Sequence, residues 1–435
     1  MRISVLALTV LFCPLAAVSD DSASFRGNPE HPGVYEGKAI RSAPQIKWKF
    51  AAQGQVLSSP ALVNGVLFVG SADHRLYALD AKTGKNRWEF KTDSGVASSP
   101  AVSEGTVYFS SYDGAFYAVS AKDGKLRWKF QAGGERRFAA KHLHGSQPAS
   151  ETMPDPFDTY LSSPLVWHGS VYFGSGDGNI YALDATTGKV IWKFQTGDVV
   201  HASPVISEGI LYLGSWDSYF YALDGATGKE HWRFKTGEDP DTHNQVGIQS
   251  SAVVAGGIVY FGCRDSKLYA IDSKTGKQVW VYDNKGSWVI ASPLVQDGKL
   301  YFETSDSGML HAVDAMTGAE FFSMKFSGWP TFSSPILAGD VLFLGSLSGK
   351  FFAIDLKLQK TLWEFQTDGN RQNGAAYTKV DGTPNYEVAF AGDFYDDMVV
   401  GVQKMRSVGA IYSSPVIVDG VLYFGSSDGN VYALQ

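Results

Sequence analysis

The chain contains very little cysteine, with two residues among 435. Cys13 lies in an apolar N-terminal run that we expect to be removed, which leaves Cys263 as the single thiol of the mature chain. A single thiol excludes an internal disulfide framework. Cys263 occupies a repeat position that serine holds elsewhere, at Ser71 and Ser215, so we expect a buried thiol without a catalytic role.

The chain also lacks positive charge. It has 37 lysines and arginines against 44 aspartates and glutamates, and its formal net charge is −7. A nucleic-acid-binding protein needs a basic surface to meet phosphates, so we expect no nucleic-acid partner.

Long apolar runs are missing after the N-terminus, where no stretch reaches the roughly 20 residues of a membrane-spanning helix, so we expect no transmembrane segment. At the N-terminus, Arg2 is followed by an apolar run and then by small residues up to Ser19. This pattern predicts a signal peptide over residues 1–19 and an exported protein, either periplasmic or secreted. Phe12 precedes Cys13 where a lipoprotein signal has a small residue, so we do not expect a lipid anchor.

Glycine and aromatic residues are abundant, with 47 glycines and 14% aromatics, which is typical of a repetitive all-β protein. One landmark is a tryptophan or phenylalanine, at Trp48, Trp88, Trp128, Trp192, Trp232, Trp280, Phe322 and Trp363. A second landmark is "SSP" or a close variant, ending at Pro60, Pro100, Pro164, Pro204, Ala252, Pro293, Pro335 and Pro415. Eight units with a period near 40 residues predict an eight-bladed β-propeller.

The first unit shows the expected blade of four antiparallel strands. Residues 56–63 form strand A, 66–71 strand B, 76–81 strand C and 86–90 strand D, with Asn64-Gly65 as a hairpin turn. The last unit ends after strand C at Gln435, whereas residues 46–50 are a strand D with no unit before them. We therefore expect the N-terminal strand to pair with the C-terminal blade and close the ring. The predicted organisation is an N-terminal extension over 20–42 and one propeller over 43–435, which we expect to be a monomer.

Insertions are confined to the connections from strand D to the next strand A, at about 133–158, 238–246 and 366–408. The opposite face of a propeller carries the A–B and C–D turns, and it stays uniform. This one-sided variation identifies the D–A face as the functional face. The stretch 366–408 is either an insertion or a degenerate ninth blade, and we favour an insertion because it lacks both landmarks. Residues 394–405 have apolar residues at helical spacing and predict a short helix.

The unit "YALDATTGKVIWKFQTGDVV" (181–200) and its relatives resemble the pyrroloquinoline quinone (PQQ) enzyme repeat, over residues 48–435. This resemblance implies an eight-bladed propeller with docking tryptophans. The family includes quinoprotein dehydrogenases and a scaffold propeller of outer-membrane β-barrel assembly. It therefore implies PQQ as a candidate cofactor, with Ca²⁺ if PQQ binds. The dehydrogenases place an adjacent Cys–Cys disulfide against the quinone, and this chain has no adjacent cysteines.

Cationic, imidazole and aromatic residues gather in the D–A connections and the neighbouring B–C turns, which suits an anionic or quinone ligand. The candidate ligand-binding residues are Arg136, Arg137, Lys141, His142, His144, His201, Trp216, Asp217, His243, Asn244, Gln245, Arg264, Asp265, Trp288 and Arg371. Arg136 and Arg137 have an alternative role, which is to pair with the acidic residues Glu151, Asp155 and Asp158 of the same insertion. His142 and His144 lack an assigned third ligand, so we expect no metal site.

Two functions follow. The first is an exported propeller that binds a small anionic or quinone-like ligand, with PQQ as one candidate, at the D–A face. The second is a non-enzymatic periplasmic scaffold that presents this face to partner proteins, as in outer-membrane protein assembly. Catalysis stays open; an enzyme of this kind would be a PQQ-dependent dehydrogenase-like oxidoreductase, and no catalytic residue is assigned.

Overall fold

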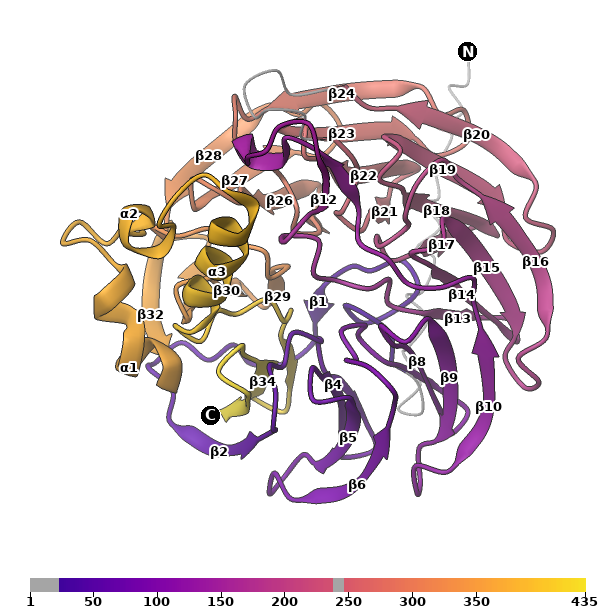
Figure 1. Cartoon of the computed structure of the whole chain (residues 1–435), viewed down its shortest axis with the longest axis horizontal. Coiled ribbons are helices and arrows are strands. Elements are labelled where there is room, and N and C mark those ends of the chain that lie inside the picture. The colour runs from indigo at the N-terminus through magenta and orange to yellow at the C-terminus, as the bar shows by residue number, and fades with distance from the viewer. Residues whose placement is uncertain (1–22, 238–245) are drawn as a thin grey trace, which may run out of the picture.

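The structure, a computed structural model, describes residues 23–237 and 246–435. Eight of the nine sheets that these residues form are blades of antiparallel strands arranged around a central channel (Figure 1), so the predicted eight-bladed propeller is confirmed. Of the four strands A to D of each blade, strand A lies nearest the channel and strand D lies at the rim.

The blades follow the chain in order, from blade one to blade eight. Their strands are, for blade one, β3 (Ala61–Val63), β4 (Val66–Ser71), β5 (Arg75–Asp80) and β6 (Asn86–Lys91); for blade two, β7 (Ala101–Ser103), β8 (Thr106–Ser110), β9 (Ala115–Ser120) and β10 (Leu126–Gln131); for blade three, β13 (Leu165–Trp167), β14 (Ser170–Gly174), β15 (Asn179–Asp184) and β16 (Val190–Gln195); and for blade four, β17 (Val205–Ser207), β18 (Ile210–Gly214), β19 (Tyr219–Asp224) and β20 (Glu230–Lys235). The others are, for blade five, β21 (Val253–Ala255), β22 (Ile258–Gly262), β23 (Lys267–Asp272) and β24 (Gln278–Asp283); for blade six, β25 (Leu294–Gln296), β26 (Lys299–Glu303), β27 (Met309–Asp314) and β28 (Glu320–Lys325); for blade seven, β29 (Ile336–Ala338), β30 (Val341–Gly345), β31 (Lys350–Asp355) and β32 (Lys360–Gln366); and for blade eight, β33 (Val416–Val418), β34 (Val421–Gly425) and β35 (Asn430–Leu434).

The ring closes through the N-terminal strand β2 (Ile46–Ala51), which pairs antiparallel with β35 and completes blade eight. The backbones of Gln45 and Gln435 exchange two hydrogen bonds of 2.8 and 2.9 Å at this joint. The predicted pairing of the N-terminal strand with the last blade is confirmed.

Neighbouring blades are joined by the docking tryptophans of strand D. The indole N–H of Trp192 donates to the carbonyl of Gly225 in the next blade at 2.9 Å, and its ring covers Gly228 of the "TGK" turn. Gly228 has a positive φ of 71°, and a Cβ there would come within 2.6 Å of the indole. The glycine is therefore required by both the turn and the close approach of the ring.

Strand A is shorter than predicted, since β3 begins at Ala61 rather than at residue 56. The two serines before it use their hydrogen bonds outside the strand ladder: Ser58 Oγ accepts the amide of Gly70, and the amide of Ser59 donates to Ser99 of the next blade. Cys263 lies fully buried and donates to the carbonyl of Gly247, as expected for a thiol in a serine position.

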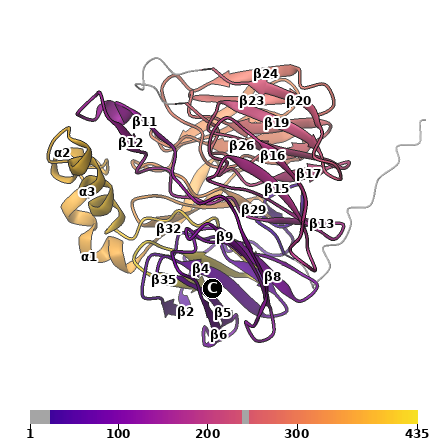
Figure 2. The same ribbon diagram turned by 45° about the vertical axis from the view of Figure 1, so that its right-hand side comes forward.

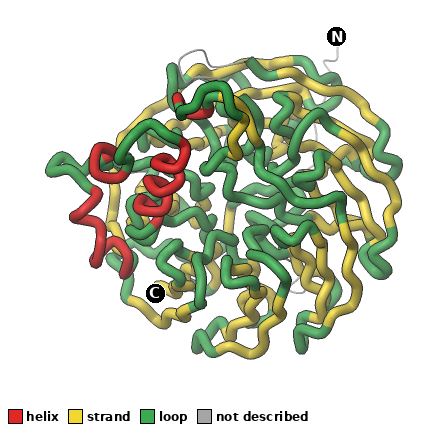
Figure 3. The backbone as a smooth tube through the Cα atoms, in the orientation of Figure 1, coloured by secondary structure: helices red, strands yellow, loops and turns green. Residues whose placement is uncertain are grey.

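Two insertions rise from the D–A face (Figure 2), and they contact each other through a hydrogen bond of 2.8 Å from the amide of Gln147 to the carbonyl of Asp393. The first carries β11 (Ala139–Lys141), the 3₁₀ turn η1 (Leu143–Gly145) and β12 (Thr152–Pro154). The second carries α1 (Asp368–Tyr377), α2 (Tyr386–Ala389) and α3 (Tyr395–Arg406), which are the α-helices of the described residues (Figure 3). The helix predicted over 394–405 is confirmed as α3. We call residues 133–160 and 368–406 together the cap.

The N-terminal extension crosses the opposite end of the channel. Ala23 bridges Val102 of β7, and the carbonyl of Pro29 accepts the amide of Ile206 in β17. The strand β1 (Val34–Tyr35) then pairs in parallel with β29 of blade seven (Figure 1). The extension is therefore part of the fold and spans the channel between distant blades.

Candidate functional site

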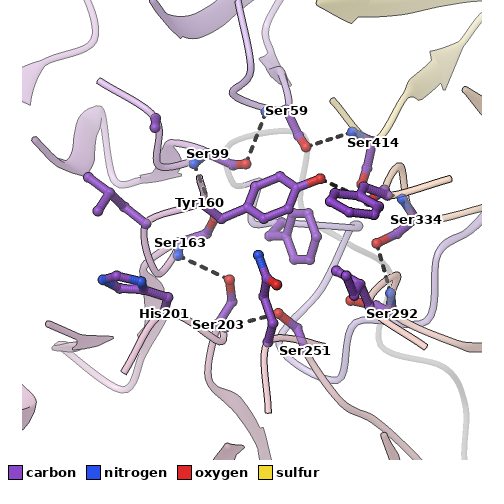
Figure 4. A pocket seen from close by; sticks show the side chains of 16 residues that line it. Ser59, Ser99, Tyr160, Ser163, His201, Ser203, Ser251, Ser292, Ser334 and Ser414 are labelled. Atoms are coloured by element: carbon purple, nitrogen blue, oxygen red, sulfur yellow. Dashed lines mark hydrogen bonds between the residues drawn. The ribbon is translucent and has the colours of Figure 1, made fainter. Parts of the chain in front are cut away.

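A ring of serines surrounds the channel, one from each blade (Figure 4). In seven of the eight serines the backbone amide donates to the hydroxyl of the serine in the next blade, over 2.8–3.1 Å. The ring consists of Ser59, Ser99, Ser163, Ser203, Ser251, Ser292, Ser334 and Ser414. The second serine of the "SSP" landmark therefore holds the blades together.

The centre of this ring is occupied by the chain itself. Tyr160, from the cap, lies inside the ring, and its hydroxyl donates to the carbonyls of Phe332 and Tyr412 at 3.0 and 3.2 Å (Figure 4). Phe25, from the N-terminal extension, also lines the space. The cavity that remains inside the ring has a volume of about 40 Å³. It accommodates a few water molecules and no organic cofactor.

The D–A mouth of the channel contains a column of stacked side chains. The guanidinium of Arg264, in the B–C turn of blade five, lies 4.3 Å from the ring centre of Trp216 and 4.6 Å from that of Trp288. Phe138 of the cap stacks on the far side of Trp216, with ring centres 4.6 Å apart and planes 14° apart. Cation–π contacts of this kind stabilise a buried arginine.

The charge of Arg264 is balanced by the cap. Its Nη1 donates to Asp155 Oδ2 at 2.5 Å, and both side chains are fully buried. The remaining donors Nε and Nη2 reach the side-chain carbonyl of Gln249, at 3.2 and 2.8 Å. His144 approaches the same carboxylate, with its Nε2 3.1 Å from Asp155 Oδ1. Burial alone would raise the pKa of Asp155, but Arg264 and His144 hold that pKa well below its usual value.

A second buried ion cluster lies beside the column. Nδ1 of His201 is 2.7 Å from Asp158 Oδ1, and its Nε2 is 2.8 Å from Glu135 Oε1. Burial alone would lower the pKa of His201, but these two carboxylates raise it to about 10. His201 is therefore an imidazolium at neutral pH that bonds the propeller to the cap through both ring nitrogens.

The predicted site residues fall into two groups. The structure brings His144, His201, Trp216, Arg264 and Trp288 together at the mouth, where they contact one another or the cap. The others lie apart from this centre. Asp217 and Asp265 act as turn residues, each accepting a tyrosine hydroxyl, as the corresponding aspartates of other blades do.

The remaining candidates lie on the cap or at the rim. Arg136 pairs with Asp198 at 2.8 Å, Arg137 lies over the ring of Tyr112, and Arg371 pairs with Asp368 in α1. The exposed Lys141 ends β11, and His142 Nδ1 bonds the carbonyl of Ser146. His243, Asn244 and Gln245 lie outside the described residues.

Several contributors to the site were not identified from the sequence. Asp155 and Asp158 were considered only as alternative partners of Arg136 and Arg137, and their partners are Arg264 and His201. Their acidity was the available signal, and it did not reveal the long-range partners. Tyr160 and Phe25 carry no local signature of a channel position.

The residues at the mouth do not fit PQQ with Ca²⁺. Calcium takes six to eight oxygen ligands, and within residues 23–237 and 246–435 no group of three or more His, Cys, Asp or Glu side chains is arranged to hold a metal. The buried carboxylates of Asp155 and Asp158 are already bonded to cationic groups. A planar ring stacked on Trp216 would have to displace Phe138 or Arg264.

The fold and the filling of the channel mouth by side chains of the cap define a class. It is an eight-bladed repeat propeller in which the chain itself covers both ends of the channel. Within that class, the chain belongs to the family described as outer membrane protein assembly factor BamB, whose sequence profile matches residues 43–153, 152–285 and 284–435. Its described helices are each too short or too polar to cross a lipid bilayer.

Solved structures share the fold at low sequence identity. The crystal structure of BamB from Moraxella catarrhalis is 15% identical, with a TM-score of 0.64 over 91% of this chain and 98% of that one. A quinohemoprotein alcohol dehydrogenase from Comamonas testosteroni is also 15% identical, with a TM-score of 0.69 over 96% of this chain and 81% of that one.

A curated relative, the dehydrogenase subunit of a quinone alcohol dehydrogenase from Gluconobacter oxydans, is 49% identical over 39 residues. These residues are 9% of this chain and 5% of that protein, about the length of one repeat. This short match therefore concerns the repeat alone. It gives no basis for assigning the activity of the whole dehydrogenase to this chain.

Proposed function

We propose that this chain is an exported, non-catalytic propeller that binds partner proteins through the cap on its D–A face, as a factor of outer-membrane protein assembly. The observation that carries the proposal is the closed mouth. The cap supplies both the aromatic ring and the carboxylate that a small ligand would otherwise bring to Trp216 and Arg264.

The outer surface of the cap supports a protein-binding role. Phe394, Val388 and Val400 on or beside its helices are 60%, 49% and 45% exposed. The three lie within one segment of the cap, and exposed apolar groups that gather in one patch mark protein interaction sites. Export follows from the signal-peptide pattern of residues 1–19 and agrees with a periplasmic assembly factor.

The proposal is tested by site-specific photocrosslinking in cells that make the protein. A benzophenone side chain at Phe394, in the cap, is compared with one at Leu358, on the opposite face; the two positions are 60% and 58% exposed. We expect discrete protein adducts from position 394 and none from 358. Equal patterns at both positions, or no adduct at either, would contradict the proposed binding face.

A second candidate function is the binding of a small anion on the outer surface of the cap. It is favoured by Arg137, whose neighbour within the described residues is the Tyr112 ring rather than a carboxylate. Citrate, phosphate and PQQ with Ca²⁺ can be titrated while the melting temperature and the quinone absorbance are followed. A saturable rise in melting temperature that Arg137→Ala removes would favour this function over the scaffold.

A further inference from the structure

Strand D of every blade is a sheet edge at the rim, and it leaves backbone N–H and C=O groups without a neighbouring strand. Proteins protect such edges with charged side chains. The residues directly before and after the docking aromatic are exposed in each strand D, except for Leu362 of blade seven, which packs against the core. These pairs are Arg87 and Glu89, Arg127 and Lys129, Ile191 and Lys193, His231 and Arg233, Val279 and Val281, Phe321 and Ser323, Leu362 and Glu364, and, in β2, Lys47 and Lys49.

Blades five and six depart from this protection. Val279 and Val281 of β24 are 44% and 41% exposed, and Phe321 of β28 is 53% exposed. In the other six blades at least one member of the pair is charged. The two strands whose flanking pairs lack charge, β24 and β28, are neighbours on the rim (Figure 1), and the hydroxyl of Tyr282 in β24 donates to Glu320 of β28 at 2.5 Å. We call Val279, Val281, Phe321 and Ser323 the uncharged arc.

The backbone does not explain the difference between blades. The ladder of β23 and β24 has its register shift at Val279, and the corresponding shift recurs in the other blades. The same bulged edge therefore carries charges in blades one, two and four and two valines in blade five. A sheet edge without such charges is a template for pairing with another chain, and in strand addition the side chains at alternate positions give specificity.

We infer that β24 binds an extended segment of a partner protein by strand addition. The segment carries apolar side chains at alternate positions, an acidic residue near Lys277 and a basic residue near Asp283. Lys277 directly precedes β24 and Asp283 ends it, and both are exposed, so they supply charge complementarity and fix the direction of the added strand. This surface is separate from the cap and rests on the proposed function only in that the propeller binds proteins.

The curvature of the rim argues for a flexible segment over a second copy of this chain. A strand of six residues is about 20 Å long, and two convex rims would meet along little more than that strand. Such a contact lies well below the roughly 1,200 Å² that a stable interface of two folded proteins buries. An extended segment can follow β24 and continue over Phe321 without this restriction.

The test uses a fluorescein-labelled probe peptide, Lys-Val-Thr-Val-Thr-Val-Glu, with fluorescence anisotropy and hydrogen exchange as readouts. The double variant Val279→Arg with Val281→Glu copies the pair of blade one, which the same backbone accommodates. We expect about tenfold or greater loss of affinity in this variant, about 1.4 kcal/mol or more. We also expect slower amide exchange in 278–283 when the peptide binds. The control Ile191→Arg in β16 should bind the peptide as the unaltered protein does.

Equal binding by the unaltered protein and the double variant, or protection at another strand, would overturn the inference. So would a dimer in light-scattering chromatography that the double variant abolishes, because the occupant would then be a second copy. The peptide experiment does not involve the cap, so its failure leaves the crosslinking result at Phe394 intact, and failure of the crosslinking leaves the peptide result intact.

Discussion

Replacing Asp155 with asparagine should open the cap without unfolding the propeller. Asp155 and Arg264 are both fully buried, and their ion pair measures 2.5 Å. Asparagine keeps the volume of the side chain and an oxygen that can accept the amide of Phe157, now bonded at 2.7 Å, so the change isolates the charge. Removing one partner of a buried ion pair costs about 3–5 kcal/mol because the other charge is left uncompensated.

This loss should appear first as local opening, because the cap is an insertion that the blade ladders do not require. Hydrogen exchange of residues 138–158 should accelerate by about a hundredfold for a loss near 3 kcal/mol, while strands of blade one keep their protection. The matched control is Glu151→Gln, an exposed acid of the same insertion, which should change exchange little.

Acid should reproduce the effect in the unaltered protein. The pKa of Asp155 is held below its unfolded value, so the stability that its charge contributes is present above about pH 4 and is lost as the pH falls further. The Asp155→Asn variant should lack this component. Unchanged exchange in the variant, or an equal loss of protection throughout the blades, would refute the assignment of the ion pair to cap closure.

Four further outcomes are expected. The carboxylates beside His201 raise its pKa to about 10, so the stability that the imidazolium contributes is complete below about pH 6.5 and declines as the pH rises towards 10. Hydrogen exchange of the cap, corrected for intrinsic rates, should therefore accelerate over this pH range. The variant His201→Gln should abolish this pH dependence. Trp192→Ala should lower the free energy of unfolding in urea by about 3–5 kcal/mol through cavity formation, and a loss below about 1 kcal/mol would contradict its docking role. Deleting residues 23–51 removes β2 and should lower the melting temperature sharply or cause aggregation, which light scattering detects. Titration with PQQ and Ca²⁺ should leave quinone absorbance and dye-linked alcohol oxidation unchanged, and saturable binding would instead show that the cap opens for a cofactor.

The repeated parts of the fold were predictable from the sequence because the same sequence pattern recurs in each blade. Trp192, Gly228 and the serine of "SSP" recur at fixed spacing, so one unit explains the others. The closure by residues 46–50 followed from counting strands. The helix α3 followed from apolar spacing in a stretch that lacks both landmarks.

The site was predictable only in part, because its partners are brought together by the ring and occur once each. Trp216 and Arg264 were identified as departures from the repeat, and Trp288 as an aromatic residue of a D–A connection. Their relation to Asp155 depends on how an unrepeated insertion folds back over the mouth, and no local pattern encodes that path. The N-terminal extension posed the same difficulty, since Phe25 reaches the channel through contacts with blades far along the chain.

The serine ring has a consequence for how the protein can be rebuilt. Seven amides of the ring donate in the same sense around the channel, including the bond from Ser414 of the last blade to Ser59 of the first. At this level the joint between first and last blades is chemically the same as the joints within the chain. The serine ring therefore does not distinguish this joint from the others. A circular permutant that links Gln435 to Gln45 and opens the chain at another D–A connection should form the same ring of serines.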